Sequence, residues 1–129
     1  MEVVGGQHWR LRLEAKPARV PEIRQEVVDV LARECPGVDL SAAAVVVTEL
    51  AANVVTHAYV EPGPLEVEVR CEPDSAVVTF RDWGRGFGRS IRRGRGRGLQ
   101  IVAALAERLR IDGVQPTEVK ARLARSQGS

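Results

Sequence analysis

The sequence predicts an α+β fold of two layers, in which about three helices cover one face of a mixed, mostly antiparallel sheet of about five strands. Several segments alternate apolar and charged residues, a pattern typical of strands with one buried and one solvated face. Three longer segments repeat apolar residues at helical spacing. The sequence has none of the continuous apolar strands that a doubly wound parallel sheet needs, which favours the antiparallel arrangement.

The expected elements follow from these periodicities and from the residues that interrupt them. Pro36-Gly37 ends the first helix, and Asp39 or Ser41 can cap the second. Glu61-Pro62-Gly63-Pro64 forces a turn before a hairpin. The expected helices are residues 20–33, about 41–58 and 99–108, and the expected strands are residues 9–14, 65–71, 76–80, 109–111 and 117–124.

Length and composition indicate one globular domain over residues 1–129, with residues 1–6 and 126–129 as flexible ends. Hydrophobic residues make up 44% of the chain and charged residues 28%, which is ordinary for such a domain. We expect a cytoplasmic protein without a transmembrane helix or secretory signal, because no long uncharged apolar run occurs. Cys35 and Cys71 show no metal-type spacing and are predicted to be reduced thiols.

The second expected helix is apolar nearly all round, so it should be buried on most sides. It nevertheless carries Glu49, Asn53 and His57 four residues apart, which places them on one face. Burying a polar group without a partner costs about 1–3 kcal/mol. Either this stripe is satisfied by backbone or solvent, or it lines a ligand cleft and offers oxygen atoms to a hard metal ion. We interpret His57 as a structural residue at the helix end.

Two glycine-rich motifs follow. The first, Asp82-Trp83-Gly84-Arg85-Gly86-Phe87, ends an expected strand, where a carboxylate can accept a hydrogen bond from an exocyclic amine and glycines allow the backbone to approach a flat ligand. The second, Gly94-Arg95-Gly96-Arg97-Gly98-Leu99, runs into a helix, whose free N–H groups and dipole suit phosphates. Taken singly, each motif is a weak signal, and a plain glycine-rich turn is the favoured interpretation of the first.

Arginines crowd the same region, and the net charge of only +2 argues against nucleic-acid binding as their purpose. We expect a solvated loop, with phosphate neutralisation or docking of an acidic partner as the functional alternatives. The arginines are Arg81, Arg85, Arg89, Arg92, Arg93, Arg95 and Arg97.

In this order the three motifs resemble the GHKL ATP-binding superfamily, which has the Bergerat fold. They look most like the bacterial anti-sigma factor serine/threonine-protein kinases of the RsbW type. The most specific part is the phrase Val47-Thr48-Glu49-Leu50-Ala51-Ala52-Asn53-Val54-Val55-Thr56-His57-Ala58-Tyr59. The resemblance runs from Leu13 to Leu123 and implies that ATP or ADP binds with Mg²⁺ between the helices and a glycine-rich lid.

The resemblance also implies roles for individual residues. By it, Asn53 ligates Mg²⁺, Asp82 binds the adenine amino group, and Glu49 is the general base. The remaining nucleotide-binding residues that it implies are Gly84, Gly86, Gly94, Gly96, Gly98, Leu99 and Thr117.

The function implied by the resemblance is that of an ATP-binding anti-sigma factor and protein-serine kinase in transcription regulation during bacterial stress. Its partners would be a sigma factor and a STAS-domain anti-anti-sigma protein, without direct contact to nucleic acid or membrane, and a homodimer is allowed. One alternative is a nucleotide-dependent anti-sigma module without kinase activity. Another is a switch kinase of the same superfamily that activates a PP2C-type phosphatase. Glu49 favours an enzyme, since binding alone needs only Asn53 and Asp82.

Overall fold

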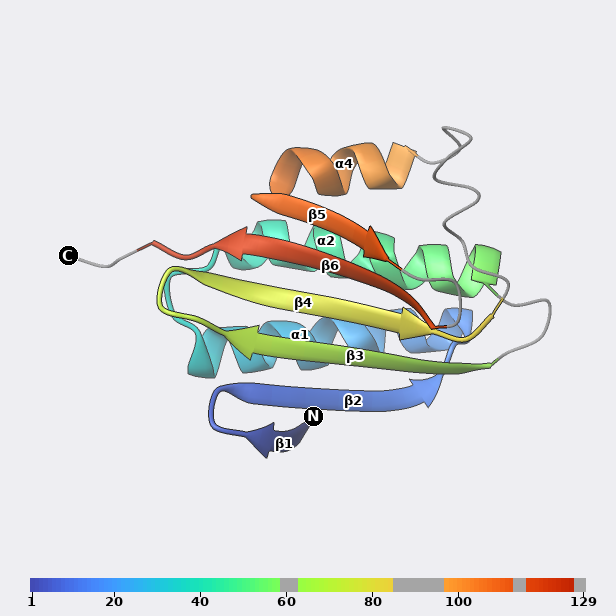
Figure 1. Cartoon of the computed structure of the whole chain (residues 1–129), viewed down its shortest axis with the longest axis horizontal. Helices are drawn as coiled ribbons and strands as arrows, with labels where there is room; N and C mark the ends of the chain where they lie inside the picture. The colour runs from blue at the N-terminus through green and yellow to red at the C-terminus, as the bar shows by residue number, and fades with distance from the viewer. Residues whose placement is uncertain (59–62, 85–96, 113–115, 127–129) are drawn as a thin grey trace.

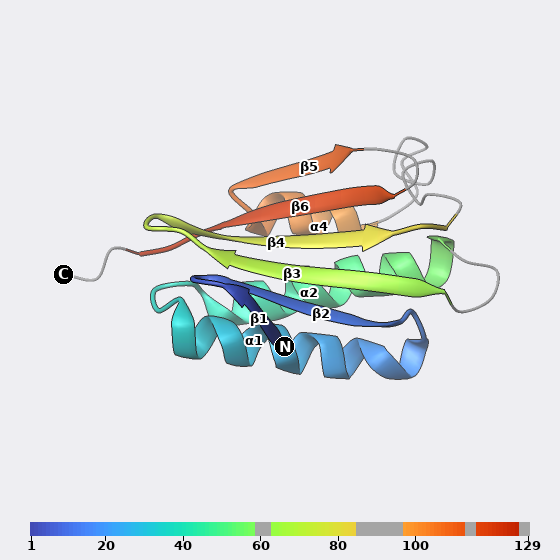
Figure 2. The same cartoon turned by 60° about the horizontal axis from the view of Figure 1, so that its bottom comes forward.

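The computed structural model describes residues 1–58, 63–84, 97–112 and 116–126. It confirms the α+β fold: a six-stranded sheet has the order β1-β2-β3-β4-β6-β5, and its helices lie on one face (Figures 1 and 2). All neighbouring strands pair antiparallel. The strands are β1 (Glu2–Gly5), β2 (His8–Glu14), β3 (Pro64–Cys71), β4 (Ser75–Asp82), β5 (Arg108–Asp112) and β6 (Thr117–Ala124), and the α-helices are α1 (Val20–Glu34), α2 (Leu40–Asn53) and α4 (Arg97–Leu105).

The core lies between the sheet and the helices α1 and α2. Because side chains alternate along a strand, every second residue of β3, β4 and β6 faces the helices. Asp39 caps α2, since its side chain accepts a hydrogen bond from Ala42 N at 3.1 Å. The fully buried side chains include Ile23, Val27 and Leu31 of α1, Val46, Val47 and Leu50 of α2, Leu65, Val67 and Val69 of β3, Val78 and Phe80 of β4, and Val119 of β6.

Several boundaries differ from the sequence-based prediction. The expected flexible start contains β1, which pairs with β2 and places Val3 opposite Trp9. The third helix begins at Arg97 and ends at Leu105, because Arg108 already belongs to an edge strand. The second helix is an α-helix only to Asn53 and continues as the π-helix η2 (Val54–Ala58). A short 3₁₀-helix, η1 (Pro17–Arg19), leads into α1.

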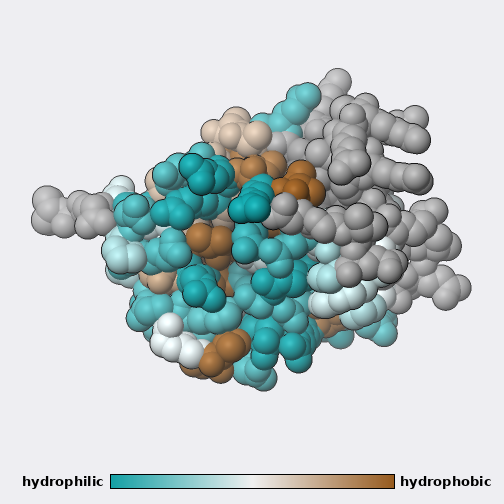
Figure 3. All heavy atoms as spheres, viewed as in Figure 1, coloured by the Kyte–Doolittle hydropathy of each residue, from teal (hydrophilic) through white to brown (hydrophobic). Residues whose placement is uncertain are grey.

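The face of the sheet opposite the helices is mainly hydrophilic (Figure 3). Arg81, which we had assigned to the arginine-rich loop, instead lies on β4 within this face. Its guanidinium pairs with Glu66 at 2.9 Å and also with Glu68 and Glu118. Arg12 Nε donates to the other oxygen of Glu66 at 2.8 Å. The charges on this face therefore form a connected network across four strands.

The prediction of reduced thiols is wrong in this structure, because Cys35 and Cys71 form a disulfide. Cys35 follows the last residue of α1 and Cys71 ends β3, with 5.7 Å between their Cα atoms. Spacing along the chain gave no signal, since the two residues are 36 positions apart and meet only through the packing of α1 on the sheet. Among the described residues, no helix is long and apolar enough to cross a membrane.

Reduction of this disulfide should lower the free energy of unfolding by about 2–4 kcal/mol, because the cross-link restricts the unfolded chain. Urea unfolding of the oxidised protein and of the protein in a dithiol reductant measures the difference. A Cys35→Ser/Cys71→Ser variant serves as the control, because its stability should not respond to the reductant. Equal midpoints for oxidised and reduced wild-type protein would contradict the expectation.

The charge network also predicts a loss of stability in acid. Burial alone would raise the pKa of Glu68, but hydrogen bonds involving His8, Glu66 and Arg81 lower it to about 2 from an ordinary value of 4.5. Between these values the unfolded chain binds the proton and the folded chain does not. The stabilisation from Glu68 is therefore complete above pH 4.5 and is lost as the pH falls toward 2.

Glu68→Gln should weaken the pH dependence of unfolding in this window, as measured by urea titrations at about pH 5 and about pH 3. Glu2→Gln is a matched control, because Glu2 is exposed and lies 3.5 Å from Arg10. If Glu68→Gln and Glu2→Gln lose stability equally in acid, the ion pairs of Glu68 do not cause the pH dependence of unfolding.

Candidate functional site

The predicted site residues that the structure describes gather at one end of the sandwich. The end of α2, the end of β4, the start of β6 and the start of α4 all lie there, on the right in Figure 1. Helix α2 contacts α4, β4 and β6. The antiparallel register places Asp82, the last residue of β4, directly opposite Thr117, the first residue of β6. Residues far apart in the sequence are thus brought to one edge of the core.

Asp82 is the most deeply buried carboxylate in the described part of the chain, with 0% of its surface exposed. It lies on the helix-facing side of β4. Gly84 N donates to its Oδ1 at 3.1 Å, while Oδ2 has no hydrogen-bond partner in the described structure. Burial raises the pKa of Asp82, and the hydrogen bond from Gly84 only partly offsets this effect. Because a buried carboxylate oxygen without a partner is costly, Oδ2 is available to accept a hydrogen bond from a donor outside the described residues.

Thr117 shares the helix-facing side of the sheet with Asp82 and is 1% exposed. Leu65 of β3 flanks Asp82 from the other side in the register and is also buried. The side chains of Thr117 and Asp82 are therefore neighbours at this end of the sheet, and the apolar Leu65 lies on the other side of Asp82. The structure thus brings together two of the residues that the sequence had singled out.

Glu49 and Asn53 lie one turn apart on α2, as the sequence predicted, and both are half-buried. Asn53 Nδ2 is buried and has no hydrogen-bond partner within the described residues. Asn53 is also the last residue of the α-helix before η2 begins. Short π-helical segments occur frequently at functional sites. The sequence gave no signal for this change, because the apolar run continues through it.

The glycine motifs are only partly covered by the structure. Gly84 lies directly after β4, and its amide orients the Asp82 carboxylate. Gly98 and Leu99 belong to the first turn of α4, which starts two residues earlier than predicted. The other predicted glycines, Gly86, Gly94 and Gly96, lie outside the described residues, as do Arg85, Arg89, Arg92, Arg93 and Arg95.

The two unpartnered side chains fit a magnesium nucleotide. A carboxylate oxygen can accept a hydrogen bond from the exocyclic amine of adenine. Rotation of the Asn53 carboxamide exchanges its nitrogen and oxygen, and that oxygen suits a hard cation such as Mg²⁺. Among the described residues no three His, Cys, Asp or Glu side chains cluster as a metal site. Mg²⁺ would accordingly be held by Asn53 together with nucleotide phosphates and water, which is its usual mode of binding.

The comparison with protein families agrees with this geometry. The family model described as a histidine kinase-like ATPase domain matches residues 13–123. A comparison with curated proteins finds no match. The matched span includes α1, α2 and α4, the strands β3 to β6, and the residues Glu49, Asn53, Asp82 and Thr117. The chain therefore belongs to the family of histidine kinase-like ATPase domains, and ATP binding is the activity that this membership indicates.

Proposed function

We propose that the protein is an ATP-binding anti-sigma factor and a protein-serine kinase that phosphorylates a STAS-domain anti-anti-sigma partner. One observation carries the nucleotide part of the proposal. Among the described residues, the buried side-chain polar atoms without a hydrogen-bond partner are Asn53 Nδ2 and Asp82 Oδ2, and both lie at the same end of the fold. The partners and the kinase activity are supported by the sequence resemblance around Glu49 and Asn53.

Selection of adenine is assigned to Asp82. Its buried Oδ2 would accept a hydrogen bond from the adenine amine, and Thr117 lies directly opposite it in the sheet. Guanine presents a carbonyl oxygen at the corresponding position, which would face the carboxylate without a proton between them. Loss of a hydrogen bond to a charged group costs about 1.5–3 kcal/mol, so ATP and ADP should be strongly preferred to guanine nucleotides.

Phosphoryl transfer requires a group that orients the serine hydroxyl and receives its proton. We assign this role to Glu49, because it shares a helical face with Asn53, is half-buried, and forms no hydrogen bond or ion pair within the part of the chain that the structure describes. In the transfer, the serine oxygen forms a bond to the γ-phosphorus, the bond to ADP breaks, and the proton passes to the Glu49 carboxylate. Such base assistance typically contributes about 10²–10⁴ in rate.

Two other functions fit the same nucleotide site. A nucleotide-dependent anti-sigma module would use Asn53 and Asp82 without needing Glu49 as a base. A switch kinase would act on a regulator of a PP2C-type phosphatase rather than bind a sigma factor. Incubation with ATP and a STAS-domain protein, followed by intact-mass analysis, separates the kinases from the module. Capture of a sigma factor or of a phosphatase on the immobilised protein separates the two kinases.

Asp82→Asn should weaken ATP binding by about ten-fold to a hundred-fold, as expected for the loss of a hydrogen bond to a charged group, and should stabilise the free protein at neutral pH. Because burial raises the pKa of Asp82 above 3.8, the folded state holds a proton longer than the unfolded state, and stability falls as the pH rises through this window. Asparagine removes this loss. Below about pH 3.8 the gain should vanish. Urea unfolding at neutral pH and below about pH 3.8 measures the change in stability, and calorimetric titration of MgATP measures the change in affinity.

Asp74→Asn is the matched control for this pair of effects, because Asp74 lies in the exposed β3–β4 turn, 3.2 Å from Arg122. It should change neither ATP affinity nor stability appreciably. An Asp82→Asn protein that binds ATP as tightly as the wild type would remove Asp82 from the site.

Glu49→Gln should keep ATP affinity within a few-fold and lose most of the phosphorylation rate, by about 10²-fold or more. Glutamine has nearly the same shape but is a poor base. Single-turnover transfer to a STAS-domain partner gives the rate, and calorimetry gives the affinity. Glu22→Gln on the exposed part of α1 is the control and should leave both unchanged. A wild-type transfer rate in Glu49→Gln would exclude this residue as the base.

A further inference from the structure

The Cys35–Cys71 disulfide lies at the end of the sandwich opposite the candidate nucleotide site. The end of α1, the β3–β4 turn and the end of β6 meet there, on the left in Figure 1. The two sulfur-bearing residues differ in exposure, at 1% for Cys35 and 7% for Cys71. Both residues are buried, and Cys71 is the less completely covered of the two.

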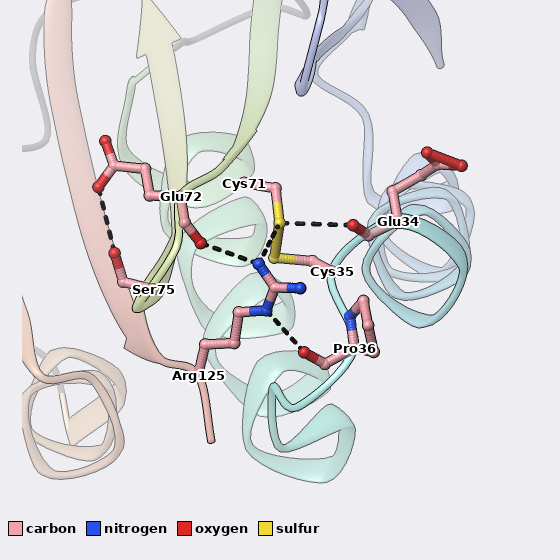
Figure 4. The surroundings of a disulfide bond; sticks show 7 residues. All are labelled: Glu34, Cys35, Pro36, Cys71, Glu72, Ser75 and Arg125. Carbon is pink, nitrogen blue, oxygen red and sulfur yellow. Dashed lines mark hydrogen bonds between the residues drawn. A yellow bond between two sulfur atoms is a disulfide. The ribbon is translucent and has the colours of Figure 1, made fainter. Parts of the chain in front are cut away.

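Arg125, which follows β6, inserts its guanidinium between the disulfide and two backbone carbonyls (Figure 4). Its Nη1 lies 3.4 Å from Cys71 Sγ and donates to the Glu72 carbonyl oxygen at 3.0 Å. Its Nε donates to the Pro36 carbonyl oxygen at 2.7 Å. The cation is thus held by the turns that follow each cysteine, directly beside one of the two sulfur atoms.

The backbone of the same C-terminal segment covers this region. Arg125 N donates to Asp74 O at 3.0 Å, and Ser126 N donates to Gly37 O at 2.9 Å. Gly37 has a φ of 99°, and a Cβ at this position would lie 2.4 Å from Ser126 O. Only glycine can adopt this positive φ without strain and also leave room for the Ser126 carbonyl oxygen. The close approach of the two segments is thus built into the turn that follows Cys35.

We propose that Cys35 and Cys71 form a reversible thiol–disulfide site that exchanges with low-molecular-weight thiols and disulfides. Cys71 is the exchanging sulfur and Cys35 the resolving one. Cys71 is the less buried residue of the pair, and the Arg125 guanidinium beside its sulfur stabilises the thiolate form in the reduced protein. When it is protonated, the Cys71 thiol can donate to the Glu34 carbonyl oxygen 3.4 Å away, so this contact favours the thiol and the Arg125 guanidinium favours the thiolate.

Oxidation of the two cysteines by oxidised glutathione proceeds in two thiol–disulfide exchange steps. The Cys71 thiolate attacks one sulfur of oxidised glutathione, forming a mixed disulfide and releasing one glutathione thiolate. Cys35 then loses its proton and attacks Cys71 Sγ, which forms the protein disulfide and releases the second glutathione thiolate. Two electrons pass from the protein to glutathione, and the two thiol protons go to solvent. Reduction follows the same steps in reverse, with glutathione or a dithiol as reductant.

The other charged groups near Cys71 are already engaged. The Glu34 side chain turns away from the sulfur in Figure 4, and its carboxylate pairs with Arg33 at 3.3 Å. The Glu72 carboxylate accepts from Ser75 Oγ at 3.2 Å and pairs with Arg122 at 3.3 Å. Of the charged groups in the described structure, Arg125 is therefore the one that acts directly on the sulfur.

The first test traps the intermediate. The full-length Cys35→Ser and Cys71→Ser variants are incubated with oxidised glutathione, and intact mass is followed with time. One glutathione adduct should form on Cys35→Ser at least about ten-fold faster than on Cys71→Ser, because only the former retains the sulfur that lies beside the Arg125 cation. Equal rates, or a faster adduct on Cys71→Ser, would overturn the assignment.

A second measurement does not depend on the folding of either variant. Reduced wild-type protein is alkylated briefly with iodoacetamide, and the labelled peptides are identified by mass. Cys71 should be labelled several-fold faster than Cys35, and oxidised glutathione should restore the disulfide. Preferential labelling of Cys35, or a disulfide that reduced glutathione opens only in denaturant, would contradict a reversible site at Cys71.

Arg125→Gln tests the role of the cation, and Arg70→Gln is the matched control. Arg70 precedes Cys71 and is exposed, but its side chain lies on the opposite face of the sheet. Alkylation of Cys71 at neutral pH should slow several-fold in Arg125→Gln and stay unchanged in Arg70→Gln. If both variants react like the wild type, the guanidinium does not activate the sulfur. These measurements need no nucleotide, so their outcome is independent of the proposed kinase function.

Discussion

The burial of α2 is the constraint on which the rest of the structure depends. This helix packs against α1 and α4 and also contacts the sheet. Its residues Val46, Val47 and Leu50 are fully buried, and each such side chain contributes about 1.5–3 kcal/mol by leaving water. A shift of α2 would lose the burial free energy of several of these side chains at once. The positions of Glu49 and Asn53 are therefore set by apolar packing and not by the polar groups themselves.

The two faces of the sheet differ in how their polar groups are paired. On the open face, Arg81 is surrounded by the carboxylates of Glu66, Glu68 and Glu118, so charge is compensated within the protein. On the helix side, Asp82 keeps one buried oxygen without a partner. Buried polar groups in folded proteins are nearly always satisfied, so an exception needs an explanation. A ligand that supplies a donor absent from the described residues would explain Asp82, whereas on the open face the protein's own side chains pair the charges.

The sequence predicted the parts of the structure that depend on local periodicity. Alternation along β3 and β4 identified the side chains that face the helices, and helical spacing placed Glu49 beside Asn53. Three features were not predictable in this way. The segment of β1 is too short and too exposed to show a pattern, η2 continues an apolar run without a break, and the contact of Cys35 with Cys71 is created only by tertiary packing. The opposition of Asp82 and Thr117 likewise needs the strand order, which periodicity does not contain.

Helix α2 connects the two chemically distinct ends of the molecule. Its start follows the turn after Cys35, and its last residue is Asn53, about 21 Å away at 1.5 Å per residue. A rigid helix transmits a displacement only if it moves as a unit, and its buried side chains oppose such a movement. Within the described residues, the contacts of Arg125 and Ser126 near the sulfur atoms are hydrogen bonds to turns. A change in the oxidation state of the cysteines should consequently act first on these contacts, while α2 keeps Glu49 and Asn53 in place.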